Sequence, residues 1–313
     1  MKAIILDSSG GPEQLREMDL PVPTIGAKEV LIQVKAISIN PVDVKTRSGK
    51  GIYARLKDIE PIVLGWDISG IIMETEAGVT GFKTGDEVFG MIHFPGHGKA
   101  YAEYVAAPAD QLALKPGNIS HGEAAGATLA ALTAYQAMVH RARVKQGDKV
   151  LVHAAAGGVG HFAVQLAKFL GAYVIGTSSA ANRDFVLSLG ADEHIDYRAQ
   201  PFEAVAKEVD FVLDTIGGEY IDRSLEVITQ GGTIISIPSG LNETVTEKAR
   251  AKNVNGYTLL VKPDGRDMQA IALLLEKGAI RSIVSRTFPF NRMPEAHLQI
   301  ESGRTIGKVV VEV

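Results

Sequence analysis

The residues best suited to chemistry lie in a glycine-rich turn at 153–160, which we call the glycine loop. It follows a β-like run at 149–152 and opens a segment whose apolar residues recur at helical spacing up to Leu170. Strand, glycine turn and helix together are the context that a dinucleotide-binding site requires, because small residues admit a pyrophosphate and the helix N-terminus offers free N–H groups. Ala155 replaces the first fingerprint glycine, so the motif reads A-x-G-x-x-G. The predicted cofactor contacts are Ala156, Gly157, Gly158, Val159 and Gly160. A purely structural glycine turn is the alternative interpretation.

The end of the second predicted strand indicates which nucleotide binds. An NAD site usually has Asp or Glu about 20 residues beyond the glycines, where it holds the ribose 2′-hydroxyl. Here that stretch carries Thr177, Ser178, Ser179 and then Arg183, and no acid precedes Asp184. Hydroxyl donors and a guanidinium suit a 2′-phosphate, so the sequence predicts NADPH as the cofactor. Arg183 as an ordinary solvated helix residue is the alternative.

Alternating strands and helices position these residues in the second half of the chain. A helix is expected over about 122–139, and a shorter one over 183–189 that ends at Gly190. The β-like runs are 149–153, 173–177, 193–197, 210–214 and 233–237. This alternation predicts an α/β Rossmann domain with a doubly wound parallel sheet.

The first part of the chain has a different character. Short β-like runs alternate with glycine and proline turns up to about residue 125, which predicts an antiparallel, barrel-like β domain. After residue 263 a helix (268–277) precedes two β-like runs, 282–288 and 308–313. We expect the last run to return to the first domain. The predicted domains are therefore 1–124, a nucleotide-binding domain at 125–262, and a return segment at 263–313.

Composition excludes several functions. The chain has 313 residues, a net charge of −4 and no cysteine. This net charge does not indicate binding to nucleic acid or to an anionic membrane. No apolar stretch is long enough to span a bilayer. Without cysteine there is neither a thiol nucleophile nor a Cys-ligated zinc. A charge appears by Asp7, too early for a signal peptide, so we expect a cytoplasmic protein.

Motifs spread over nearly the whole chain resemble those of the medium-chain dehydrogenase/reductase superfamily, and within it the zinc-independent quinone oxidoreductases. In order, the segments that carry the resemblance are 40–45, 61–70, 85–90, 132–135, 154–160, 189–192 and 195–197. The resemblance implies a GroES-like β-barrel domain combined with the Rossmann domain. It also implies a homodimer formed through an edge of the Rossmann sheet.

The resemblance also bears on metal chemistry. Zinc-dependent members of this superfamily use a cysteine near the first motif and a Gly-His-Glu sequence in the second. Here the first motif reads Ile37–Asn40 without cysteine, and Trp66 stands where the histidine would be. No metal ligand is therefore assigned, and ordinary alcohol dehydrogenation is not expected. The expected reaction is therefore direct hydride transfer to a quinone or to an α,β-unsaturated carbonyl.

The family match suggests roles for several side chains. Asn40 is expected near the nicotinamide as an amide donor, or else as a turn-forming residue before Pro41. Tyr53 resembles the tyrosine of the related enoyl-thioester reductases and is a candidate proton donor, although an exposed loop tyrosine is equally expected there. Thr133 resembles a threonine that contacts the nicotinamide, or else bonds its own helix backbone.

Three further contacts with the cofactor are expected, of which those of Tyr197 and Lys308 are implied by the resemblance. They are Tyr197 near the adenosine, Ile237 in the loop 236–240 beside the nicotinamide, and Lys308 in the C-terminal motif. Rim packing for Tyr197 and an ordinary edge-strand lysine for Lys308 are the alternatives. Asp43 and Asp67 are expected to hold loops through backbone N–H groups.

One histidine pair invites a metal interpretation. His93 and His97 have the spacing H-x-x-x-H, but Pro95 and the neighbouring glycines make the segment a loop, and no carboxylate is adjacent. No metal site is predicted there.

Three functions remain open. The first is an NADPH-dependent reductase of a small quinone or enone. The second is an enoyl-thioester reductase, which would depend strictly on Tyr53. The third is a non-catalytic NADPH-binding protein of the crystallin type.

Overall fold

The computed structural model describes all 313 residues, which form two compact units. The first unit comprises Met1–Leu132, Lys262–Gly278 and Ser282–Val313. The second comprises Thr133–Val261 and Ala279–Arg281, so it is inserted into the first. The boundaries expected from the sequence, near 125 and 262, lie close to these divisions.

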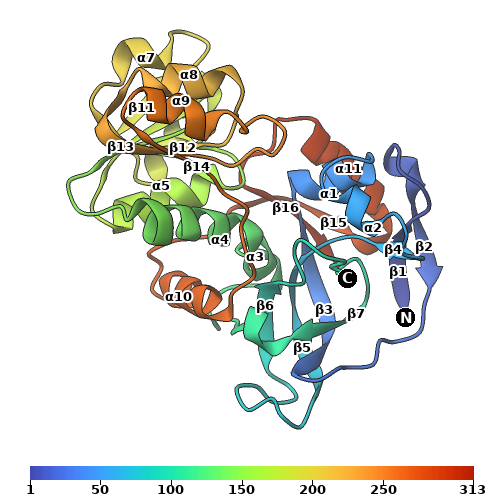
Figure 1. Cartoon of the computed structure of the whole chain (residues 1–313). Coiled ribbons are helices and arrows are strands. Elements are labelled where there is room, and N and C mark those ends of the chain that lie inside the picture. Colours follow the sequence, from blue (N-terminus) through green and yellow to red (C-terminus); the bar gives the residue numbers. More distant parts are fainter. The chain divides into compact units, whose positions relative to one another are not determined.

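The first unit is built on a seven-stranded sheet with the order β15-β16-β3-β5-β6-β8, in which β7 also pairs with β3 (Figure 1). Its strands are β3 (Glu29–Ile39), β5 (Asp67–Thr75), β6 (Glu87–Met91), β7 (Tyr104–Pro108), β8 (Ala113–Leu114), β15 (Val284–Pro289) and β16 (Lys308–Glu312). A smaller sheet holds β1 (Lys2–Leu6), β2 (Leu15–Asp19) and β4 (Ile62–Val63). All pairings are antiparallel except β15 with β16. The predicted β domain and the return of the last strand are confirmed, because β16 pairs with β3.

Strand β3 is the centre of this sheet. Buried and partly exposed residues alternate along its first half, and its last four residues are all buried. Ile32, Ile37 and Ile39 are fully enclosed. Helix α3 (His121–Gly126) covers the sheet with Ala125, which packs against Ala36 and Val310.

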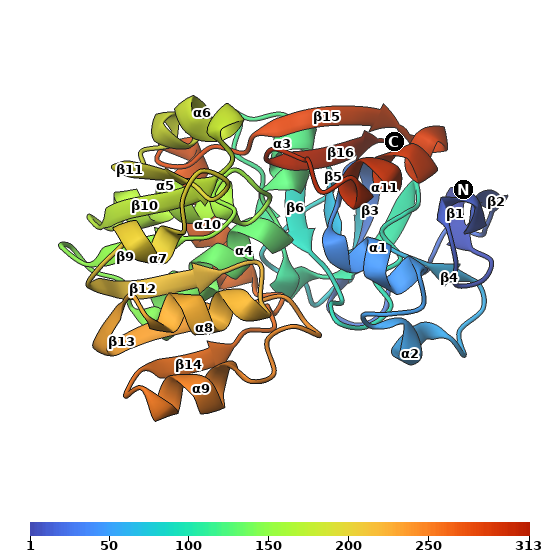
Figure 2. The ribbon, with the colours of Figure 1, turned by 90° about the horizontal axis from the view of Figure 1, so that it is seen from above.

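The second unit is a six-stranded parallel sheet with the order β11-β10-β9-β12-β13-β14 (Figure 2). Its strands are β9 (Lys149–Val152), β10 (Tyr173–Ser178), β11 (Glu193–Asp196), β12 (Val209–Asp214), β13 (Ile228–Ser236) and β14 (Asn255–Thr258). Its helices are α5 (Gly160–Phe169), α6 (Arg183–Ser188), α7 (Phe202–Val205), α8 (Glu219–Leu225) and α9 (Val245–Ala251). Residues of α7, α8 and α9 share one core with Leu151, Val212 and Ile234 of the sheet. The predicted doubly wound sheet is confirmed.

Some local predictions differ from the structure. The expected helix over 122–139 is broken into α3, α4 (Leu129–Tyr135) and a π-helical turn, η3 (Gln136–Ala142), because the backbone leaves helical geometry at Ala127. The segment after Asn40 forms helix α1 (Pro41–Arg47), and α11 (Met293–Glu301) is a further helix that the sequence patterns do not reveal. Among all the helices, none combines the length and apolar character that crossing a membrane requires.

Candidate functional site

The glycine loop connects β9 to α5 and is closely packed. Gly160, the first residue of α5, packs so closely that an added Cβ would lie 2.2 Å from the Ala154 carbonyl oxygen. The loop is tied to the sheet by the Ala155 N–H, which donates to the Thr177 carbonyl at 2.9 Å. The N–H groups of Gly158 and Val159 make no backbone hydrogen bond, so they are available to an anion at the start of the ten-residue helix.

The residues expected around a 2′-phosphate lie in the last two positions of β10 and just beyond it. Thr177 and Ser178 are buried, Ser179 is half-buried, and Arg183 begins α6. The Arg183 side chain is 61% exposed and its only ionic partner is Asp184, which is 98% exposed. A guanidinium held this loosely can turn toward a ligand at little cost.

Three of the other predicted cofactor contacts, Thr133, Tyr197 and Ile237, lie in the second unit. Tyr197 is 42% exposed just after β11, and the Arg198 guanidinium lies 5.6 Å from its ring centre. Ile237 is half-buried, and its N–H donates to the Asp214 carbonyl at 3.0 Å. Thr133 is buried in α4, at the first position of this unit.

Asp214 is a site residue that the sequence analysis missed. It ends β12, is fully buried and accepts hydrogen bonds from the N–H groups of Ile216 and Gly217, each at 2.9 Å. The Ser236 hydroxyl donates to its second oxygen at 2.5 Å. Asp214 therefore fixes the ends of β12 and β13 beside Ile237. Its place at the carboxyl end of a parallel strand was the available signal.

In the first unit, four buried residues form what we call the polar cluster: Asn40, Asp43, Asp67 and Lys308. The Lys308 ammonium donates to Asn40 Oδ1 at 2.5 Å, and Asn40 Nδ2 donates to Asp67 Oδ2 at 2.7 Å. Asn40 is thus held at both ends of its amide and is only 1% exposed. The Lys308 ammonium group points to this amide. Both residues therefore have a structural role within the polar cluster, in addition to the cofactor contacts that the family resemblance implies.

The two carboxylates of the polar cluster hold backbone groups, and that prediction is confirmed. Asp43 Oδ2 accepts from the Asn40 N–H at 2.7 Å, and Asp67 Oδ1 accepts from the Leu129 N–H at 3.2 Å. Burial, reinforced by the charge of Asp67, raises the pKa of Asp43 to about 7. Burial likewise raises the pKa of Asp67 and lowers that of Lys308, whereas the attraction between the two opposes both shifts.

The raised pKa of Asp43 predicts a pH-dependent stability. Its ordinary pKa is 3.8, so between about pH 4 and 7 the folded protein keeps a proton that the unfolded chain releases. The stabilising contribution is therefore complete below about pH 4 and is lost as the pH rises through 7. The free energy of unfolding should therefore decrease by roughly 3 kcal/mol from pH 5 to pH 8 through Asp43, at 1.36 kcal/mol per pKa unit, and Asp43→Asn should remove this decrease. Urea unfolding of both proteins across this range checks the prediction, and parallel curves would contradict it.

A second buried chain of polar groups adjoins the polar cluster and was not found from the sequence. Tyr101 is fully buried, and its hydroxyl lies 2.9 Å from His297 Nε2. Burial, together with the nearby Arg47 guanidinium, lowers the pKa of His297 to about 3, so the imidazole is neutral at physiological pH. Arg47 is buried and forms an ion pair with Glu301 of α11. The Arg47–Glu301 ion pair joins α1 to α11.

Tyr53 is the first residue of α2 (Tyr53–Leu56) and is half-buried. No hydrogen bond of its hydroxyl is found within the chain, so this group remains available to a ligand. The role of proton donor stays a prediction.

The position where zinc-dependent family members have a histidine is filled by an indole. Trp66 is fully buried, its Nε1 donates to the Gly96 carbonyl at 2.8 Å, and Phe94 packs edge-on at 5.5 Å between ring centres. The chain has no group of three or more His, Asp or Glu side chains arranged to hold a metal ion.

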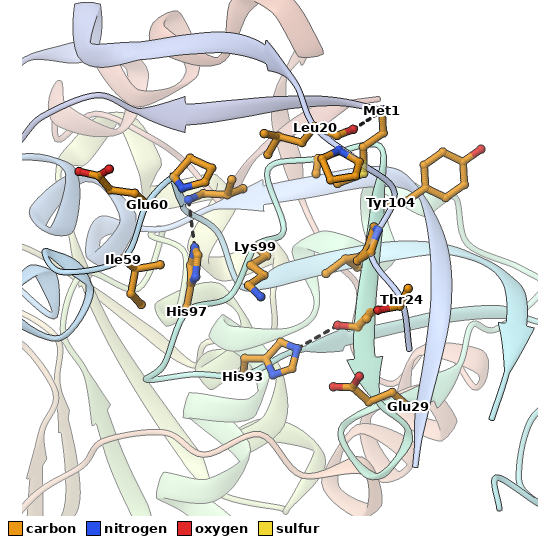
Figure 3. Close-up of a pocket in the computed structure, with 17 residues that line it drawn as sticks. Met1, Leu20, Thr24, Glu29, Ile59, Glu60, His93, His97, Lys99 and Tyr104 are labelled. Carbon is orange, nitrogen blue, oxygen red and sulfur yellow. Dashed lines mark hydrogen bonds between the residues drawn. The ribbon is translucent and has the colours of Figure 1, made fainter. Parts of the chain in front are cut away.

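His93 and His97 line a cavity of about 680 Å³ within the first unit (Figure 3). His97 Nε2 accepts a hydrogen bond from the Val63 N–H at 3.0 Å, and His93 Nε2 lies 2.9 Å from the Ala106 carbonyl. Burial lowers the pKa of His97 to about 4. Asn40, Tyr53 and Lys308 are not among the lining residues, so this cavity is separate from the polar cluster.

Comparison with known proteins agrees with this architecture. Residues 26–117 match the family model of the alcohol dehydrogenase GroES-like domain, and residues 189–311 match that of the zinc-binding dehydrogenases. A 2-methylene-furan-3-one reductase of Solanum lycopersicum is 34% identical over 99% of this chain and 79% of its own length. An NADPH-dependent alkenal/one oxidoreductase of Arabidopsis thaliana is 33% identical with the same coverage.

Solved structures extend the match. A quinone oxidoreductase from Coxiella burnetii superposes with a TM-score of 0.95 at 39% identity, over 100% of this chain and 99% of that one. Sequence and structure agree along the whole length, with both units included. The chain therefore belongs to the medium-chain dehydrogenase/reductase superfamily, among its quinone and alkenal oxidoreductases.

Proposed function

We propose that this protein reduces small quinones or α,β-unsaturated carbonyl compounds with NADPH, without zinc. The observation that carries the proposal is the glycine loop with free N–H groups, followed by Ser178 and Arg183 where an NAD site has an acid. The names of the relatives support it, since one is a 2-methylene-furan-3-one reductase and another an NADPH-dependent alkenal/one oxidoreductase.

NADPH, when bound, supplies the hydride, and the chain positions the reactants. The N–H groups of Gly158 and Val159 would hold the pyrophosphate, and Ser178 with Arg183 would hold the 2′-phosphate. Negative charge develops on the acceptor oxygen during reduction, and a nearby hydroxyl donor stabilises it. Tyr53, whose hydroxyl has no partner within the chain, is the candidate donor, with water as the alternative.

The test combines turnover with cofactor choice. We expect NADPH oxidation, followed at 340 nm, with a small quinone or an enone. Arg183→Ala should weaken NADPH binding about tenfold and NADH binding by less than twofold, because only NADPH carries the 2′-phosphate. Equal losses for both cofactors would contradict the assignment of Arg183.

Two alternatives give different outcomes in the same assay. Efficient turnover of enoyl thioesters, abolished by Tyr53→Phe, would favour an enoyl-thioester reductase. Tight NADPH binding with no turnover across a broad panel of acceptors would favour a non-catalytic binding protein.

We also propose a homodimer that forms through an edge of the second unit's sheet. Strand β14 ends that sheet, and its residues Asn255 and Thr258 are exposed. Light scattering of the purified protein measures the oligomeric state. A cytoplasmic location stays a prediction, since relatives of this chain include mitochondrial and chloroplast proteins.

A further inference from the structure

His194 makes a contact beside the residues proposed for the 2′-phosphate. It lies in β11, which runs parallel to β10 with Gly176 opposite His194 and Ser178 opposite Asp196. From this position the His194 ring reaches diagonally across the strands, and its Nε2 lies 2.8 Å from Ser178 Oγ. Ser178 is 4% exposed, and this imidazole is the only side chain bonded to its hydroxyl.

The His194–Ser178 pair lies on the same face of the sheet as the glycine loop. An added Cβ at Gly176 would lie 2.9 Å from the Cβ of Ala155 in the loop. Alternate residues of a strand share a face, and residues opposite one another in paired strands do too. Gly176, Ser178 and His194 therefore all face the loop that we propose to hold the pyrophosphate.

The direction of the Ser178 hydroxyl proton depends on the protonation of the imidazole. A serine hydroxyl has one proton and two acceptor sites, whereas a protonated histidine donates from both ring nitrogens. When His194 is charged, its Nε2–H donates to Ser178 Oγ and the serine proton must point elsewhere. The present alternative acceptor is the Ser179 carbonyl at 3.2 Å, a weak bond that a phosphate oxygen can replace.

The charges around His194 come from three elements. Asp196 on β11 itself favours the imidazolium, whereas Arg183 on α6 disfavours it, and Ser178 on β10 is neutral. Burial is the largest effect, and together with Arg183 it lowers the pKa of His194 below the usual 6.5. The imidazole is thus mostly neutral at pH 7, and a phosphate dianion beside it would favour its protonation.

We propose that His194 is a positioning residue that makes the preference for NADPH over NADH increase as the pH falls, by turning the Ser178 hydroxyl toward the 2′-phosphate. This inference rests on the proposed function, because it requires the 2′-phosphate to lie at Ser178 and Arg183. NADH has no group at that place, so its affinity should not respond to His194. Binding of NADPH should also be accompanied by uptake of a proton.

The experiment compares the protein with His194→Gln, because glutamine can keep a hydrogen bond to Ser178 but does not titrate. Dissociation constants for NADPH and NADH are measured by fluorescence at pH 6 and 8, and proton uptake by calorimetry in two buffers of different ionisation enthalpy. The dissociation constant of NADH divided by that of NADPH measures the preference for NADPH. This ratio should decrease from pH 6 to pH 8, and the decrease should be about fivefold larger in the unaltered protein than in His194→Gln. The phosphate itself titrates near pH 6 but does so equally in both proteins.

His121→Gln is the matched control, because His121 makes the same kind of contact with a serine, Ser69, in the first unit, at 2.7 Å. It should behave like the unaltered protein. Identical pH profiles for the protein and His194→Gln, with NADPH still preferred, would overturn the role of His194 and leave the proposed function intact. Absence of any preference for NADPH at either pH would overturn both.

Discussion

Replacing Lys308 with methionine is expected to lower the free energy of unfolding by about 3–5 kcal/mol, the usual cost of removing one partner from a buried group of charges. Lys308 is the cation of the polar cluster, and the carboxyl groups of Asp43 and Asp67 are both fully buried beside it. Methionine fills a similar volume, so the loss should reflect charge rather than packing. Urea unfolding at pH 8 measures the effect.

The double variant Asp67→Asn/Lys308→Met separates charge from shape. Asparagine keeps an oxygen that can accept the Leu129 N–H but carries no charge, so at least half of the lost stability should return. The cost of Lys308→Met should also be smaller at pH 5 than at pH 8, because the two carboxyl groups then hold their protons more fully. If the single and double variants were equally unstable at both pH values, the charge explanation would be wrong.

Gly160→Ala is expected to weaken NADPH binding at least 100-fold. The added methyl group would lie 2.2 Å from the Ala154 carbonyl oxygen and 2.8 Å from the Ala155 Cα. Both clashing atoms belong to the backbone, so the loop itself must move. Its N–H groups would then no longer point toward the pyrophosphate. Cofactor titration by fluorescence measures the loss, and circular dichroism monitors the folding of the variant.

Gly122→Ala provides the control for this substitution. Gly122 is also near the start of a helix, but its added Cβ would meet only Val310 Cγ1 at 3.6 Å and Ser120 Oγ at 3.9 Å, which is ordinary contact. This variant should bind NADPH as the unaltered protein does. If Gly160→Ala also bound NADPH normally while folded, the glycine loop could not be the pyrophosphate site.

Regular periodicity explains which parts of the fold were predictable. The strands of the second unit are short apolar runs separated by turn residues, and the loop glycines mark the start of α5, so the parallel sheet could be predicted. The break between α3 and α4 could not, because the segment 121–135 is apolar and helical on both sides of Ala127. At this break Thr128 and the Leu129 N–H contact the distant carboxylate of Asp67, and such a contact leaves no local pattern in the sequence.

The candidate site was predictable only in its local parts. The glycine loop, Ser178 and Arg183 are close together in the sequence, and their types indicate their chemistry. The contact between Asn40 and Lys308 spans 268 residues, and that between Tyr101 and His297 spans 196. No pattern in one sequence reveals such pairs. The role of His194 could not be predicted for a similar reason, because its partner Ser178 lies on the neighbouring strand.

The position of β16 in its sheet has a consequence for the order in which the protein folds. This strand lies between β15 and β3, yet it is synthesised after all the other helices and strands of the chain. The inserted second unit has all its strands in continuous sequence and can fold while translation proceeds, since domains generally fold as units. Until Lys308–Glu312 are synthesised, the Ala36–Ile39 part of β3 lacks its partner strand, whereas β7 already pairs with Glu29–Gln33 on the same edge. We expect chaperones to bind the nascent chain during that interval, because the unpaired part of β3 is an apolar strand edge.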